Sequence, residues 1–80
     1  MKNKKQRQAT IGTIVIRSYI AQAVQQAREA HGWTRYELAK RAGMQLTHLA
    51  KIEQAEFSAR IDTINHLCRV LDIRIALPIY

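Results

Sequence analysis

The segment Thr34–Gln54, TRYELAKRAGMQLTHLAKIEQ, constrains the fold of this chain more than any other. Thr34 stands three residues before Glu37, which is the spacing of a capping box, in which each side chain binds the other residue's backbone N–H at the start of a helix. Gly43 stands where a helix that ends in a left-handed residue needs no Cβ. A second helical pattern follows, with Leu49 three residues before another apolar residue on the same face. The segment therefore predicts two short helices joined by a tight turn.

The outer face of the second predicted helix carries side chains of medium length that form hydrogen bonds. A helix face that is only solvated usually carries a mixture of Glu and Lys, whereas this face carries mainly uncharged polar side chains and no Glu. Two helices around a glycine-containing turn, with a polar reading face on the second, are typical of a helix-turn-helix that places its second helix in the major groove of DNA. The residues of this face are Gln45, Thr47, His48, Lys51 and Gln54.

The region from about Ser18 to Leu77 resembles the phage-repressor/Cro, or Xre-type, helix-turn-helix family. The residues that carry the resemblance are Arg28, GWT at Gly32–Thr34, ELA at Glu37–Ala39, AG at Ala42–Gly43 and KIE at Lys51–Glu53. Within that family the chain is most similar to HipB-type antitoxins, through GWTRYELAKRAGM and the terminal VLDIRIAL.

This resemblance implies a mainly α fold, a lambda-repressor-like bundle of four to five short helices with a C-terminal strand in a dimer interface. It also implies a homodimeric repressor of its own operon that restrains a HipA-like serine/threonine kinase toxin. Two alternatives stay open: a stand-alone phage-type or chromosomal Xre regulator, and a protein-interaction adaptor that keeps the fold without reading DNA. Leu46, in place of a polar reader, and an apolar terminal strand able to extend a partner's sheet favour the adaptor.

The resemblance also assigns roles to residues, position by position. At these positions the side-chain chemistry suits adenine for Gln45, guanine for Lys51, and a thymine methyl group for Leu46 or the Thr47 methyl. Relatives often carry a long polar residue at position 46 and Ser or Thr at position 45, so the reading code differs here. Arg35 either contacts phosphate or braces the reading residues. The expected DNA-binding residues are Arg35, Gln45, Leu46, Thr47, His48, Lys51 and Gln54.

Glu53 lies on the reading helix, where a carboxylate facing the duplex would repel phosphates. We therefore expect it to point inward and to pair with a cation, and the family resemblance implies that this cation is Arg28. Such a charge-assisted bond would fix the first helix to the reading helix. Relatives often have glycine where Ala55 stands, so the turn after the reading helix differs here as well.

Size and charge limit the remaining possibilities. An 80-residue chain is one domain with a marginal core, so a partner chain is expected to stabilise it. A formal charge of +7 and a pI near 10.2 favour a polyanionic partner. Cys68 is a lone cysteine, no apolar run reaches the length of a membrane span, and no metal-ligand or nucleophile pattern is present. We expect a soluble cytoplasmic protein that is not an enzyme and binds no cofactor or metal.

The two ends of the chain have distinct patterns. Residues 1–9 form a basic segment that either lies along DNA or only keeps the protein soluble, and residues 10–80 form the folded domain. Thr10–Ile16 is rich in β-branched residues and predicts a short strand, with the start of the first helix as the alternative. Residues 73–79 alternate between apolar and other residues, which predicts a half-buried strand. A lone strand needs a partner, which is Thr10–Ile16, its own copy in a second subunit, or both. The expected dimer-interface residues are Ile73, Ile75 and Leu77.

The remaining helices follow from apolar stripes. Ser18 is the expected N-cap of a helix to about His31, and a last helix is expected from about Arg60 to Leu71. Trp33 stands where a hydrophobic staple packs onto the next helix, which favours a core anchor over a base-stacking role.

Overall fold

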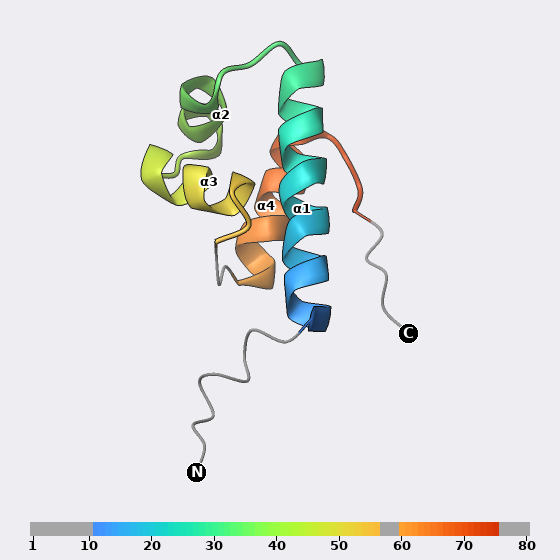
Figure 1. Ribbon diagram of the computed structural model, residues 1–80. Helices are drawn as coiled ribbons and strands as arrows, with labels where there is room; N and C mark the ends of the chain where they lie inside the picture. Colours follow the sequence, from blue (N-terminus) through green and yellow to red (C-terminus); the bar gives the residue numbers. More distant parts are fainter. Residues whose placement is uncertain (1–10, 57–59, 76–80) are drawn as a thin grey trace.

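Four helices make up the computed structural model, which describes residues 11–56 and 60–75. They are α1 (Ile11–Ala30), α2 (Arg35–Ala42), α3 (Leu46–Glu53) and α4 (Ile61–Leu71). α1 is the long upright helix of Figure 1; α2 and α3 lie to one side of it and α4 packs behind. α3 contacts α1 and α2, and α4 contacts the same two helices. The predicted helical bundle is therefore confirmed for the described residues.

All four helices end in the same way, at a residue with positive φ. At the end of α1, the Trp33 N–H binds the Arg28 carbonyl (3.1 Å) and the Gly32 N–H binds the Glu29 carbonyl (2.9 Å). This pair of bonds is a Schellman motif, which satisfies carbonyls left without a partner at a helix end. The same pair closes α2, α3 and α4. The left-handed residues are Gly32, Gly43, Ala55 and Asp72.

Six side chains form the fully buried centre of the bundle, and every helix contributes at least one of them. The predicted stripes on α1, α3 and α4 therefore meet in one core. Trp33 is half-buried and packs against this core, which confirms its interpretation as an anchor. The six residues are Val24, Leu38, Leu49, Ile52, Leu67 and Leu71.

The predicted strand at Thr10–Ile16 is wrong for residues 11–16, which form the first turns of α1. Ser18 is likewise not an N-cap, since it lies inside this helix. Ile16 packs against the core four residues before buried Ile20 and eight before buried Val24. That i, i+4, i+8 stripe is helical, and burying it outweighs the modest strand preference of β-branched residues.

The predicted terminal strand is absent at residues 73–75, the part of it that the structure describes. Residues 76–79 and the basic segment at residues 1–9 lie outside the described residues. Ile73 and Ile75 are half-buried and pack against the core cluster, but no described segment offers them a strand to pair with. Thr10–Ile16, one of the two expected partners, is helical over its described residues, so the described part of the chain holds no second strand.

Two histidine side chains form hydrogen bonds to carbonyl groups at the ends of other helices. His31, just after α1, donates from Nε2 to the Leu71 carbonyl at the end of α4 (2.7 Å). His66 of α4 donates from Nε2 to the Ala42 carbonyl at the end of α2 (2.8 Å). His66 is exposed, as its position off the apolar stripe predicts, yet it still satisfies an orphan carbonyl.

No helix among the described residues is both long enough and apolar enough to span a lipid bilayer.

Replacing Ala55 with Gly is expected to raise the free energy of unfolding. Ala55 has φ +62°, which places its Cβ against the following carbonyl, and glycine removes that conflict. Glycine loses more backbone entropy on folding than alanine, which offsets part of the gain. The expected net gain is about 0.5–1 kcal/mol, and it raises the melting temperature by about 4 °C. Thermal unfolding followed by circular dichroism measures it. Ala50→Gly, inside α3, is the matched control and costs about 1 kcal/mol; an unstable Ala55→Gly variant would contradict the left-handed turn.

Candidate nucleic-acid interface

α3 presents opposite faces to the core and to solvent. Leu49 and Ile52 have no exposed surface, whereas the N-cap residue Gln45 and the polar residues of the other face are exposed. All but one of the residues predicted to bind DNA lie on this exposed face or at its ends, so the helix brings them together. They are Gln45, Leu46, Thr47, His48, Lys51 and Gln54.

The first turn of α3 is open. Gln45 makes no hydrogen bond from its side chain to the helix end, and the first turn holds no acidic residue. At α2, in contrast, Thr34 Oγ1 accepts from the Glu37 N–H (3.1 Å) and Glu37 Oε1 accepts from the Thr34 N–H (2.9 Å). Backbone N–H groups and the positive end of the helix dipole at α3 are thus free to meet an anion, whereas α2 already holds a carboxylate.

The predicted partners Arg28 and Glu53 form a bidentate ion pair. Arg28 Nε donates to Glu53 Oε2 (2.8 Å) and Arg28 Nη2 donates to Glu53 Oε1 (3.1 Å). The Glu53 side chain has no exposed surface, so it depends on these bonds for the stabilisation that water would give. The third nitrogen, Arg28 Nη1, donates to the Trp33 carbonyl (2.8 Å) and so also holds the segment between α1 and α2.

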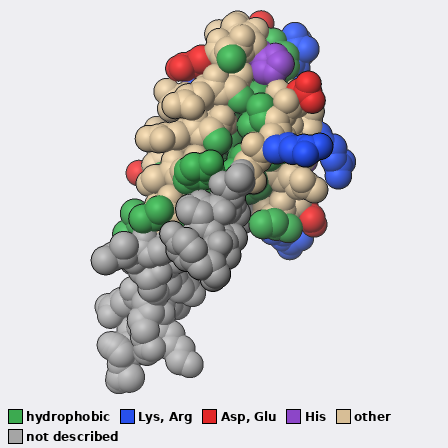
Figure 2. All heavy atoms as spheres, turned by 90° about the vertical axis from the view of Figure 1, so that its right-hand side faces the viewer, with side chains coloured by type: hydrophobic (Ala, Val, Ile, Leu, Met, Phe, Trp, Pro, Cys, Tyr) green, Lys and Arg blue, Asp and Glu red, His purple; other side chains and the backbone are tan. Residues whose placement is uncertain are grey.

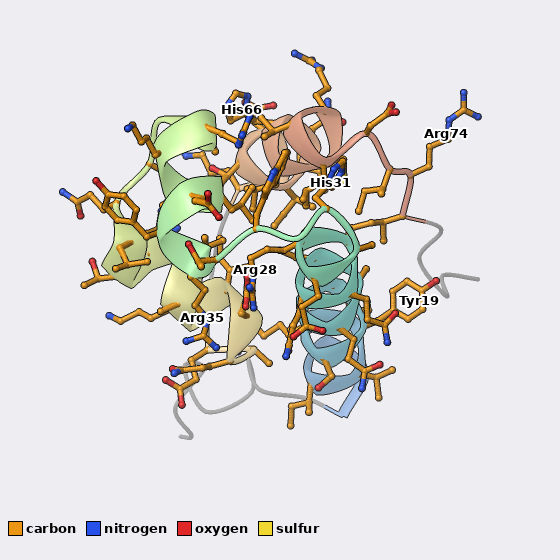
Figure 3. The ribbon with its side chains drawn as sticks, turned by 90° about the horizontal axis from the view of Figure 1, so that it is seen from above. Tyr19, Arg28, His31, Arg35, His66 and Arg74 are labelled. Carbon is orange, nitrogen blue, oxygen red and sulfur yellow. The ribbon has the colours of Figure 1, made fainter. Side chains whose placement is uncertain are left out.

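Arg35 is a second cation on the same carboxylate. Its Nε donates to Glu53 Oε1 at 3.0 Å, and its side chain is 40% exposed. Figure 3 shows the Arg28 and Arg35 side chains both directed toward α3, from α1 and from the start of α2. This contact joins the start of α2 to the last residue of α3, and both roles predicted for Arg35 stay open. No local pattern predicts this contact, because an arginine at the first helical position has the same spacing whether or not it is paired.

Glu29 Oε2 also lies 3.9 Å from Arg28 Nη2, so two arginines face two carboxylates in this cluster. Arg28 is only 11% exposed, whereas the Arg35 side chain is 40% exposed, so Arg35 is the arginine of this pair that a ligand in solvent can reach. The guanidinium of Arg35 is fixed at Nε while it is partly exposed, at the start of α2 and beside α3. A guanidinium held in this way binds phosphate with little further loss of side-chain entropy.

The Trp33 ring contacts two side chains of its own chain. The His31 ring stacks on it with centroids 4.2 Å apart, and the Arg41 guanidinium lies 4.3 Å from the ring centroid. These contacts and its packing on the core give Trp33 a structural role within its own chain.

One exposed aromatic residue is not among the residues that the sequence predicts to bind DNA. Tyr36, next to Arg35 on α2, is 63% exposed. An aromatic residue on a short amphipathic helix is usually interpreted as core, and only the packed structure shows which side of α2 it occupies.

Comparison with known proteins identifies the family. A family model described as a helix-turn-helix matches residues 24–77, which is more than half of the chain. The protein belongs to the Xre/Cro-type helix-turn-helix family. No curated protein and no solved structure gives a match. Members of this family are typically not enzymes, and membership indicates a DNA-binding transcription regulator.

Metal and thiol chemistry receive no support from the described part of the chain. Within it, no group of three or more His, Cys, Asp or Glu side chains is placed to hold a metal ion. Cys68 is half-buried against the core, and this burial raises the pKa of its thiol. The reactive thiolate is therefore less populated near neutral pH, in keeping with the role of a small core residue.

Arg28→Ala is expected to lower the free energy of unfolding by about 3 kcal/mol, because it removes two of the three bonds to a buried carboxylate. The remaining bond to Arg35 keeps the loss at the low end of the range for broken buried pairs. Urea denaturation measures the change, and Lys40→Ala, an exposed cation of α2, is the control, with a change within about 0.5 kcal/mol. Equal stability of the two variants would show that the pair does not hold α3.

Proposed function

We propose that this protein is a transcriptional repressor that binds an inverted-repeat operator as a homodimer. The observation that carries the proposal is the exposed polar face of α3, on a helix whose opposite face is fully buried and whose last residue is held by two arginines. A polar helix held rigidly on a small bundle is what base reading in the major groove requires.

Affinity in this proposal comes from the phosphate backbone. The chain has a formal charge of +7, and the interface supplies the Arg35 guanidinium and the open first turn of α3. Contacts of this kind position a protein on DNA and weaken with salt, but they do not choose a sequence.

Choice of sequence falls to the early residues of α3. The family resemblance implies the positions, and side-chain chemistry assigns adenine to Gln45, guanine to Lys51 and a thymine methyl group to Leu46 or Thr47. Leu46 is 44% exposed, which is unusual for leucine on a polar face and is explained if a thymine methyl group covers it.

A two-fold dimer doubles the site that one chain reads. Two α3 helices related by such an axis enter successive major grooves, about 34 Å apart, so the operator is an inverted repeat. The expected interface includes Ile73, Ile75 and Leu77, with tails that pair across the axis.

The finer proposal is an antitoxin. The likeness of GWTRYELAKRAGM and VLDIRIAL to HipB-type antitoxins supports a repressor that also binds a HipA-like serine/threonine kinase and regulates the shared operon. Co-expression with the product of the neighbouring gene tests this role: a stable complex that inhibits the kinase supports it, and independent behaviour of the two proteins favours a stand-alone regulator. If the protein binds no DNA in gel shifts on the upstream region of its own operon, the adaptor alternative replaces the repressor.

Lys51→Ala is expected to cost about 1–3 kcal/mol of operator binding, concentrated at one base pair of each half-site, because a lysine that reads guanine loses its partner there. Binding to a set of single-base operator variants locates that base pair. Lys40→Ala serves as the matched control and is expected to show no position-specific loss. Equal weakening of Lys51→Ala on every operator variant would make Lys51 a phosphate contact instead.

The role of Leu46 is tested by replacing individual operator thymines with deoxyuracil, which removes only the methyl group. Wild-type protein is expected to lose about fourfold in affinity at one thymine of each half-site, the value of one buried methyl group. Leu46→Ala is expected to be insensitive to the same replacement. If no thymine position distinguishes the two proteins, Leu46 does not read DNA.

A further inference from the structure

Leu46 is the one exposed large hydrophobic residue of α3, a helix that the structure describes in full. It is the first residue of this helix, and it belongs neither to the buried core nor to the half-buried hydrophobic residues that pack against that core. The fold therefore makes no use of its apolar surface, which lies at the open first turn of the proposed reading helix.

The residues one turn further along α3 place no polar side chain beside Leu46. Leu49 and Ala50 follow it by three and four residues, so they lie on its side of the helix. Leu49 has no exposed surface, and Ala50 is half-buried. Thr47, the next residue, projects about 100° further around the helix. A group bound against Leu46 is therefore recognised through apolar contact.

Apolar surface elsewhere on the molecule has a different form. An apolar groove of about 470 Å³ lies between α1, α4 and the segment that follows α4. Figure 2 shows hydrophobic side chains gathered over α1 and α4. A broad surface of this kind suits a protein partner, and two residues of its lining, Ile73 and Ile75, already belong to the expected dimer interface. Leu46, a single leucine among polar side chains, suits a ligand with one small apolar group instead.

Base edges in the major groove offer one such group, the methyl group on C5 of thymine. 5-Methylcytosine carries the same methyl group on the same ring carbon. The two bases differ beside it, where thymine has the O4 acceptor and cytosine has the N4 amino donor. Only a polar side chain distinguishes an acceptor from a donor, and the side chain of leucine has no polar atom.

We infer that Leu46 binds the C5 methyl group of 5-methylcytosine as well as that of thymine. Methylation of a cytosine at the operator position that Leu46 contacts then raises the affinity of the protein for that operator. The inference rests on the repressor proposed above, and it extends the bases that α3 recognises to a methylated one. The added contact is the one that a thymine would make at the same position.

Four synthetic operators test the inference. In one half-site, at the position where loss of the thymine methyl group weakens wild-type binding, they carry T·A, deoxyuracil·A, C·G or 5-methylcytosine·G. Gel shifts are expected to show that wild-type protein binds T·A about fourfold more tightly than deoxyuracil·A, and 5-methylcytosine·G about fourfold more tightly than C·G. Each comparison keeps the opposite base unchanged, so contacts to that base cancel. Leu46→Ala is expected to bring both ratios close to one.

Leu46→Met and Thr47→Ser are the matched controls. Methionine keeps an apolar side chain of similar volume, so both ratios are expected to stay near fourfold. Thr47→Ser removes the other methyl group of this turn and is expected to leave both ratios unchanged. Loss of both ratios in Thr47→Ser would assign the contact to Thr47 and overturn the inference. Circular dichroism checks that the variants keep the wild-type helix content, as expected for substitutions at exposed positions.

The outcomes separate this inference from the proposed function. Wild-type protein that binds all four operators, with equal affinity for C·G and 5-methylcytosine·G, would overturn the inference and leave the repressor intact. Wild-type protein that binds none of the four would overturn the proposed repressor as well.

Discussion

The carboxylate of Glu53 is the point on which this structure depends. It has no exposed surface, and its two oxygens accept three hydrogen bonds, two from Arg28 and one from Arg35. A buried carboxylate is costly without such partners, so the end of α1, the start of α2 and the end of α3 are held in one arrangement. The axis of α3 is set by this contact together with the packing of Leu49 and Ile52. The proposed readers of DNA are therefore held by charge on one side and by apolar packing on the other.

The molecule separates its polar and apolar surfaces. The exposed side of α3 carries hydrogen-bonding side chains and an uncapped helix end, which suit phosphates and base edges. The groove between α1 and α4 carries isoleucines bordered by charges of both signs, which suit another protein surface.

Local patterns predicted most of the fold. The Thr34–Glu37 capping box and the left-handed Gly43 are as expected, because each depends on residues within one turn of a helix. The strand at Thr10–Ile16 is wrong over its described residues, because strand preference is weak beside the burial of Ile16 and Ile20 on one helical stripe. The terminal strand forms only if its backbone pairs with a second strand. The described residues of one chain contain no such strand.

The sequence by itself determined where α2, α3 and α4 lie, which side of α3 is polar, and that Glu53 turns inward. These properties follow from spacing along the chain and from the cost of placing a carboxylate against DNA. Only the tertiary structure decided that Arg35 shares Glu53 with Arg28, that His31 and His66 close the ends of other helices, and that isoleucines far apart in sequence line one groove. Those contacts join residues 18 or more positions apart, and the packing of whole helices, which no local pattern encodes, brings them together.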